Sequence, residues 1–233
     1  MNLQKLTIVG KEKLAPDVYL FRLQMEKRLD YFPGQHVVLQ VEPRVFRSYS
    51  IVEIENGEPA VMVLIVDVRP AGPASVFFEN AREGSALNLV GAALGRFIVH
   101  DNDCKKVFVA TGTGLAPFIP MIKAALQSRP EAEITLFFGV RHLDEDYCAR
   151  FYEGFANNAQ RYPNFRIYPC ISKPERDLPE GYLEGRVTAH VPKMMKDFRE
   201  TDFYICGNPA MVDELKGLLT QNGATKIHEE KYA

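Results

Sequence analysis

Residues 107–117, VFVATGTGLAP, decide the fold of the second half of the chain. The apolar run 107–110 predicts a fully buried strand, and the glycines that follow predict a tight turn into a helix over 117–127. A buried strand, a glycine-rich turn and a helix together form the start of a βαβ unit. In such units ligands bind at the carboxyl ends of the strands.

The same alternation continues to the end of the chain. Further strands are predicted at 134–139, 165–171, 203–206 and 226–231, and helical patterns occupy 145–159 and 210–221. Strands that alternate with helices predict a parallel sheet with helices against it. We therefore expect a five-stranded parallel sheet in a nucleotide-binding α/β domain over residues 101–233.

The first hundred residues have a different pattern. Short segments rich in Val, Ile, Leu, Tyr and Phe are separated by turn signals such as Pro33-Gly34 and Glu83-Gly84. The predicted strands are 3–14, 18–25, 35–42, 47–54, 60–68 and 86–91, with one helical interruption at 74–82. Six short strands at near-regular spacing predict a closed antiparallel barrel, which we expect to form a domain over residues 1–100.

Composition and charge exclude several classes of function. The apolar share of 46% and the charged share of 25% are those of a globular protein. The net charge of −2 favours no nucleic-acid partner. No apolar run approaches the roughly 20 residues that span a bilayer, and the first residues lack the features of a secretory signal. We therefore expect a cytoplasmic protein. We also expect it to be a monomer.

The cysteines and histidines predict no metal site. The four cysteines are Cys104, Cys148, Cys170 and Cys206, and no two of them are close in sequence. Zinc knuckles and iron–sulfur clusters of the ferredoxin kind need clustered thiolates. If electrons pass through one-electron centres, those centres lie on another protein.

Two motifs in the first half suit a phosphate-bearing ligand. In 47–50, RSYS, the Arg47 guanidinium is a planar fork suited to a diphosphate, and Tyr49 lies on the same strand face as Arg47. In 72–75, GPAS, the start of a helix offers backbone N–H groups to an anion. Taken singly, each is also what an ordinary barrel strand or helix start contains.

Two motifs in the second half stand where a strand meets a helix. The turn 111–117, TGTGLAP, lets the backbone approach a ligand, although it is not the G-x-G-x-x-G fingerprint. The segment 206–211, CGNPAM, ends a predicted strand and begins a helix. A structural turn and a buried apolar cysteine are the alternatives for these two motifs.

The order and spacing of these motifs resemble the ferredoxin–NAD(P)+ reductase family, in its compact bacterial type. The segments 33–35, PGQ, and 91–97, GAALGRF, add to the resemblance, which covers nearly the whole chain. The second segment departs from the family pattern, because it is one residue longer and lacks the proline. The resemblance implies an FAD-binding barrel followed by an NAD(P)-binding domain.

The resemblance also implies site residues. Those that bind FAD are Arg47, Ser48, Tyr49, Ser50, Ile65, Gly72, Pro73, Ala74 and Ser75. Those that bind the nicotinamide coenzyme are Thr113, Gly114, Arg141, Ser172, Lys173, Gly207, Asn208, Pro209 and Met211. Ser50 and Cys206 would flank the reacting atoms of flavin and nicotinamide. Tyr232 would either cover the flavin ring or complete the last strand and pack against a helix.

Coenzyme choice depends on basic residues past the second and third strands of the α/β domain. Arg141 follows the second strand, and Ser172-Lys173 follows the third, resembling the Ser-Arg pair of NADPH-using relatives. Lysine is a poorer phosphate fork than arginine, so we expect a preference for NADPH over NADH rather than exclusion of NADH.

The implied activity is hydride transfer between NAD(P)H and FAD, and single-electron transfer between FAD and a carrier such as ferredoxin or flavodoxin. Two alternatives remain at this point. One is an NAD(P)H:flavin reductase that releases reduced free flavin. The other is an electron-transfer flavoprotein subunit of a larger oxygenase or dehydrogenase complex.

Overall fold

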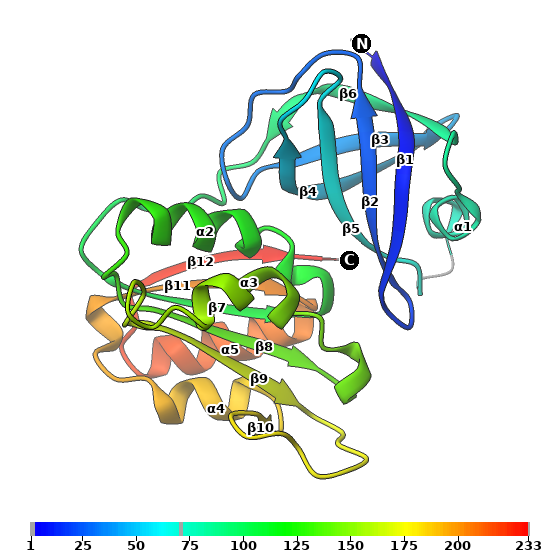
Figure 1. The fold of residues 1–233 in the computed structure, drawn as a ribbon. Helices are drawn as coiled ribbons and strands as arrows, with labels where there is room; N and C mark the ends of the chain where they lie inside the picture. Colours follow the sequence, from blue (N-terminus) through cyan, green and yellow to red (C-terminus); the bar gives the residue numbers. More distant parts are fainter. Residues whose placement is uncertain (1–2, 70–71, 233) are drawn as a thin grey trace. The chain divides into compact units, whose positions relative to one another are not determined.

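The chain folds into two compact units that divide after Val99, with Ile119–Met121 counted with the first unit. This computed structural model describes residues 3–69 and 72–232 (Figure 1). Each unit has its own hydrophobic core and is described by itself below. The predicted domain boundary, between residues 100 and 101, lies next to this division and stays a prediction.

The first unit is a closed antiparallel barrel, as predicted. Its strands are β1 (Leu3–Ala15), β2 (Val18–Met25), β3 (His36–Glu42), β4 (Val45–Glu55), β5 (Val61–Asp67) and β6 (Ala86–Leu94). Around the barrel they follow the order β1-β2-β5-β4-β3-β6, and β6 pairs with β1 to close it. The core is formed by the inward set of alternating side chains, such as Leu6 and Ile8 on β1 and Phe21 and Leu23 on β2.

One helix, α1 (Pro73–Asn80), interrupts the barrel strands. It is attached by Phe78, whose ring packs 4.9 Å from that of Phe21 and 5.2 Å from that of Tyr49. The ammonium of Lys11 on β1 donates to the carbonyls of Phe78, Glu79 and Ala81, at 3.0, 2.6 and 3.2 Å. A cation on the last carbonyls of a helix satisfies groups that have no partner within the helix.

The second unit is a parallel sheet with helices on both faces. Its strands are β7 (Lys105–Thr111), β8 (Ile134–Val140), β9 (Phe165–Ile171), β10 (Leu183–Glu184), β11 (Thr201–Gly207) and β12 (Lys226–Lys231). Their order across the sheet is β10-β9-β8-β7-β11-β12. The parallel sheet is confirmed, and the two-residue strand β10 adds a sixth member at one edge. A strand of two residues is too short to leave a recognisable alternation in the sequence.

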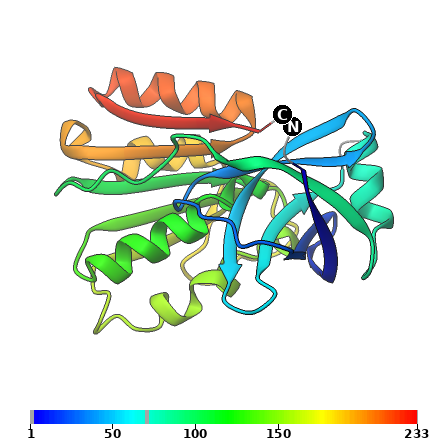
Figure 2. The ribbon, with the colours of Figure 1, turned by 90° about the horizontal axis from the view of Figure 1, so that it is seen from above.

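The helices of this unit are α2 (Phe118–Ser128), α3 (Ala149–Ala156), α4 (Val187–Met194) and α5 (Pro209–Gln221). Figure 2 shows α2 and α3 on one side of the sheet and α5 on the other. Helices α4 and α5 share a core with every second residue of the central strands, among them Val107 and Val109 on β7. Phe108, between those two, faces the other way and packs 5.1 Å from Phe118 of α2.

Two helix predictions differ from the structure. The helix expected over 145–159 is shorter, because residues 143–145 form a separate 3-10 turn (η2, Leu143–Glu145) and Asp146 accepts a hydrogen bond from the Cys148 N–H. Helix α4 was not expected, since its sequence VTAHVPKM is rich in β-branched residues and contains Pro192. It forms because Val187 and Val191, one turn apart, are buried in the core beside α5.

Among the described residues, the helices are all too short or too polar to cross a membrane.

Candidate cofactor sites

The order of the parallel strands identifies one edge of the second unit as a ligand site. From β7 the chain runs outward through β8, β9 and β10, and it then returns to the other side of β7 as β11 and β12. The connections that leave β7 and β11 therefore diverge, and in open α/β sheets ligands bind at the carboxyl ends of the strands where the order reverses in this way. The motifs 111–117 and 206–211 lie there.

Two glycines allow the ends of β7 and β11 to touch through their backbones. A Cβ on Gly114 would lie 2.3 Å from the carbonyl oxygen of Cys206 and 2.7 Å from the Cα of Gly207. A Cβ on Gly207, whose φ is +137°, would lie 2.3 Å from the Thr111 hydroxyl oxygen. All three distances are shorter than any van der Waals contact, so the pairing of the two motifs needs glycine at both positions.

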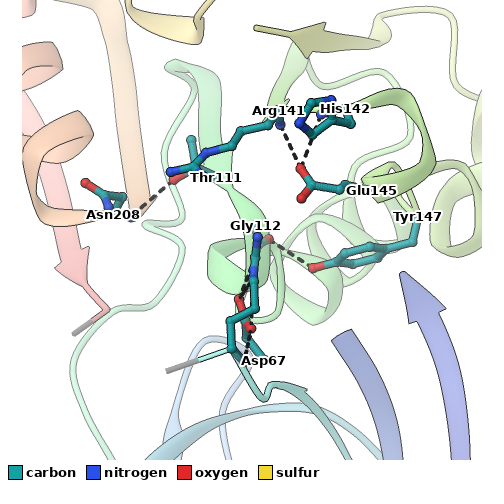
Figure 3. A network of polar contacts seen from close by, with 9 residues as sticks. Asp67, Thr111, Gly112, Arg141, His142, Glu145, Tyr147 and Asn208 are labelled. Carbon is teal, nitrogen blue, oxygen red and sulfur yellow. Dashed lines mark hydrogen bonds and ion pairs between the residues drawn. The ribbon is translucent and has the colours of Figure 1, made fainter. Parts of the chain in front are cut away.

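Side chains support the same contact. The Thr111 hydroxyl accepts a hydrogen bond from the Asn208 N–H at 3.1 Å, as Figure 3 shows. The Asn208 side chain in turn accepts from the Ala210 N–H at 2.9 Å and caps α5, with Pro209 at its first position. This is the helix start that the sequence predicted, and such a start attracts anionic groups. Met211, by contrast, places its side chain in the core beside α4.

The 3-10 turn η1 (Gly112–Leu115) follows β7 directly. It contains Thr113, which is half-buried, and Gly114, which is buried. The carbonyl of Gly112 accepts a hydrogen bond from the Tyr147 hydroxyl at 2.9 Å (Figure 3). The sequence did not indicate Tyr147, because it lies 35 residues away and between two strands.

Cys206 is fully buried at the end of β11. Burial raises the pKa of its thiol well above the ordinary value; the nearby Glu230 carboxylate raises it further, and a hydrogen bond with the Tyr232 side chain lowers it. The thiol is therefore protonated at neutral pH. Tyr232 continues β12 past its last residue, since its N–H donates to the Gly207 carbonyl at 2.9 Å.

Glu230 is a candidate site residue that the sequence analysis missed. It lies directly beside Cys206 in the register between β11 and β12. Burial raises the pKa of its carboxyl to about 6. A carboxyl that titrates near neutrality and lies next to a candidate site cysteine is able to hold or release a proton there. Only strand register, which sequence spacing does not provide, reveals this pairing.

A second group of predicted residues gathers past β8 and β9. Arg141 and Lys173 are exposed, and the Lys173 N–H donates to the Arg141 carbonyl at 2.8 Å. The Ser172 hydroxyl donates to the Val140 carbonyl at 3.3 Å. The structure thus brings Arg141, Ser172 and Lys173 together, which gives two cationic side chains and a hydroxyl at the carboxyl edge of the sheet.

In the barrel, the predicted residues of β4 lie in a row. Arg47 is exposed and donates to the Phe46 carbonyl at 2.8 Å, and Ser48 beside it is also exposed. Tyr49 packs edge-on against Phe78 of α1, and burial raises the pKa of its hydroxyl to about 12. Ser50 is buried and lies opposite His36 of β3.

The start of α1 is the other half of the predicted phosphate site in this unit. Gly72 stands at the N-cap and carries no side chain to cap the helix, and Pro73 occupies the first turn. Ala74 is buried and Ser75 half-buried. The contact between Tyr49 and Phe78 joins β4, the strand that carries Arg47, to α1.

Ile65, also predicted to bind FAD, lies on β5. It is buried but points away from the barrel core, which takes its neighbours Leu64 and Val66. Its side chain is therefore on the outer face of the barrel wall.

These features fit the two predicted cofactors. A diphosphate needs a cationic fork and a helix start, and the barrel unit supplies Arg47 and residues 72–75. Dinucleotides bind at the topological switch point of an open α/β sheet, and the second unit has such a point between β7 and β11.

Comparison with known proteins agrees with this division. Residues 5–98 match an oxidoreductase FAD-binding domain, and residues 108–216 match an oxidoreductase NAD-binding domain. Together the two matches span most of the chain. The chain belongs to the ferredoxin–NAD(P)+ reductase family. The predicted family and its FAD and NAD(P) domains are thereby confirmed, whereas the roles of individual residues remain predictions.

Relatives of this family member include components of oxygenase systems. The ferredoxin–NAD(P)+ reductase component of the naphthalene 1,2-dioxygenase system of Pseudomonas putida is 28% identical, and the match covers 95% of this chain and 66% of that protein. The toluate 1,2-dioxygenase electron transfer component of Pseudomonas putida is 30% identical over 88% of this chain and 60% of that protein. The chain thus spans less than two thirds of the length of these relatives.

A solved structure of the same fold is that of an Amycolatopsis cytochrome P450 reductase. It superposes with a TM-score of 0.87 at 26% identity, over 99% of this chain and 69% of that chain. The barrel and the parallel sheet described above therefore form the fold of this family.

The contact between η1 and β11 can be tested by adding one methyl group. Gly114→Ala places a Cβ against the Cys206 carbonyl, so we expect a loss of stability of about 1–3 kcal/mol. We also expect weaker coenzyme binding, since the two motifs would move apart. Urea denaturation and coenzyme titration measure the two effects.

The matched control is Gly154→Ala on α3, where a Cβ would meet no atom within 4 Å. Alanine is the better helix former, so stability there should stay unchanged or rise by up to about 1 kcal/mol. Equal stability of the two variants would contradict a required backbone contact at Gly114.

Proposed function

We propose that this chain oxidises NAD(P)H with a bound FAD and passes the electrons one at a time to a separate carrier protein, such as a ferredoxin or a flavodoxin. The observation that carries the proposal is the presence, in one chain, of an FAD-binding domain and an NAD-binding domain, each with the phosphate-binding features described above. FAD, when bound, supplies the conversion between two-electron and one-electron transfer. The protein residues bind and orient the cofactors and exclude water.

In the barrel, we assign the FAD diphosphate to Arg47 and the start of α1. Tyr49, held edge-on against Phe78, would present its ring to the cofactor while Ser50 offers a hydroxyl. The position of Tyr49 is set by packing rather than by the ligand, which lowers the entropy cost of binding. Ser48 and Ile65 complete the proposed FAD residues.

In the second unit, we assign the coenzyme to the carboxyl ends of β7 and β11. The backbone of Thr113 and Gly114 would line one side, and residues 207–209 the other, with Met211 as support from the core. Cys206 would offer a neutral thiol to the nicotinamide, because burial keeps it protonated. A neutral group adds no charge where hydride is transferred, and Glu230 beside it is able to exchange protons near neutral pH.

Tyr232 keeps two alternatives in this proposal. Its backbone hydrogen bond to Gly207 and its side-chain bond to Cys206 support the packing role. The role of covering the flavin requires the side chain to leave Cys206. Both alternatives place Tyr232 next to a proposed site residue.

Turnover with defined acceptors tests the proposed function. The purified protein, loaded with FAD and mixed with NADPH under anaerobic conditions, should bleach its flavin absorbance and then reduce an added ferredoxin or flavodoxin. The carrier should be reduced faster than free FMN or riboflavin at equal concentration. Faster reduction of the free flavins would instead support the flavin reductase.

The names of the relatives give specific support to a third possibility, an electron-transfer component of an oxygenase system. In that case the acceptor would be the ferredoxin or oxygenase component of such a system. The acceptor series therefore includes an oxygenase-linked ferredoxin, and preferential reduction of that ferredoxin would favour this destination for the electrons.

The assignment of Arg47 to the FAD diphosphate predicts a specific loss of affinity. A charged hydrogen bond is worth about 1.5–3 kcal/mol, so Arg47→Ala should weaken FAD binding by roughly ten- to a hundredfold. Arg28→Ala, which removes an equal charge from an exposed position of the same unit, serves as the control. Equilibrium dialysis against FAD measures both. Unchanged FAD affinity in Arg47→Ala would remove Arg47 from the site.

We further propose that Arg141, Ser172 and Lys173 bind the 2′-phosphate of NADP, so that NADPH is preferred. Lys173→Ala should then lower kcat/KM for NADPH by about tenfold and leave the value for NADH unchanged. Arg176→Ala removes the same charge from the same exposed segment and should change neither value. An unaltered NADPH-to-NADH ratio in Lys173→Ala would contradict the assignment.

A further inference from the structure

Three consecutive residues after β8 each form hydrogen bonds to a different segment of the second unit. Glu145 ends η2, Asp146 and Tyr147 follow it before α3, and none of the three belongs to a sequence motif described above. Figure 3 shows Glu145 turned toward Arg141 and His142, and Tyr147 turned toward Gly112. The segment 145–147 therefore contacts two of the turns that line the carboxyl edge of the sheet.

Glu145 holds the turn that carries Arg141. One carboxylate oxygen of Glu145 accepts from the Arg141 N–H at 2.9 Å and from the His142 N–H at 3.3 Å. Backbone N–H groups bonded to a carboxylate are held by charge-assisted hydrogen bonds, which are stronger than neutral ones. These bonds hold the backbone of Arg141 and His142 just past the end of β8.

Asp146 connects the same segment to the chain that precedes β10. Its carboxylate accepts from the Cys148 N–H at 2.8 Å and from the Tyr182 hydroxyl at 2.7 Å. Burial, followed by this hydrogen bond, raises the pKa of Tyr182, so its hydroxyl remains a donor. Asp146 thus anchors 145–147 at the start of α3 and at the loop that follows β9.

Tyr147 reaches the glycine turn after β7. Its hydroxyl donates to the Gly112 carbonyl at 2.9 Å, and its ring is 5% exposed and packs 5.4 Å from that of Phe138. Gly112 has a φ of +53°, and a Cβ there would meet no atom within 4 Å. Gly112 therefore has no side chain to pack, and the Tyr147 hydroxyl adds a hydrogen bond from outside the turn to the backbone bonds of η1.

Fixing the Gly112 carbonyl also fixes the Thr113 N–H. The two groups belong to one planar trans peptide and point in opposite directions. The Tyr147 hydroxyl therefore sets where the Thr113 N–H points, at the turn that the proposed function assigns to the coenzyme.

We infer that Tyr147 is a positioning residue for the coenzyme turn Gly112–Leu115, and that residues 145–147 hold this turn and the Arg141 turn in a common frame. The inference rests on the proposed function for its effect on flavin reduction. It identifies a residue that touches neither cofactor in the assignment above and acts through the Gly112 peptide.

Tyr147→Phe tests the inference, because it keeps the ring and removes only the hydroxyl. One hydrogen bond is worth about 0.5–1.5 kcal/mol, so the rate of flavin reduction at saturating NADPH should fall by about threefold to tenfold. Binding of 2′-phospho-ADP-ribose, which lacks the nicotinamide, should stay unchanged. Anaerobic stopped-flow absorbance and calorimetric titration measure the two quantities.

A second readout does not depend on turnover. In the ¹H–¹⁵N spectrum the Thr113 amide should shift and exchange faster with solvent in Tyr147→Phe than in the wild type. Tyr204→Phe is the matched control, since its buried hydroxyl also bonds a backbone group, the His100 N–H at 2.8 Å. Each variant loses one hydrogen bond from a buried tyrosine, so the two should lose a similar amount of stability. In Tyr204→Phe, however, the Thr113 amide resonance and the rate of flavin reduction should stay at their wild-type values.

The outcomes separate the inference from the proposed function. An unchanged Thr113 amide in Tyr147→Phe, or equal slowing of flavin reduction in Tyr147→Phe and Tyr204→Phe, would overturn the positioning role. A wild-type flavin that neither NADPH nor NADH reduces would overturn the proposed function, while the Thr113 amide would still report whether Tyr147 holds the turn.

Discussion

The backbone contact between η1 and the end of β11 is the constraint on which the second unit, the one that contains the NAD-binding domain, depends. Gly114 and Gly207 bring two strand ends closer than any side chain would allow, at the point where the strand order reverses. The chain leaves the two strands in opposite directions there, and the close backbone approach is possible because both residues lack a Cβ. A single methyl group would act on the fold and on the site together.

In the barrel unit, side chains rather than backbone contacts fix the proposed binding element, α1. The start of α1 can bind an anion only if the helix stays folded and fixed in position. A helix this short is marginally stable by itself and depends on tertiary contacts. Lys11 binds the last carbonyls of α1, and Phe78 packs it against β2 and β4. The start of α1, to which we assign the FAD diphosphate, carries no side-chain cap, and the contacts that hold the helix come from its last turn.

Burial sets the chemistry of the residues near Cys206. Removal from water keeps the Cys206 thiol neutral and raises the pKa of Glu230 to about 6, because a charged form is poorly solvated there. In the proposed function, this neutral thiol and this carboxyl, which titrates near neutrality, lie where hydride is transferred. In that proposal the protein orients the cofactors and exchanges protons, and the cofactors carry the electrons.

The sequence by itself determined the elements and their class, because hydrophobic periodicity and turn residues are local properties. The barrel strands, every parallel strand except the two-residue β10, and the motifs 47–50, 72–75, 111–117 and 206–211 are visible in it. Tertiary structure alone decided which distant residues meet. Strand register placed Glu230 beside Cys206, and a buried hydroxyl 35 residues from Gly112 came to hold its carbonyl. Helix α4 likewise formed against its own propensity, because burying Val187 and Val191 outweighs the cost of Pro192 and the β-branched residues.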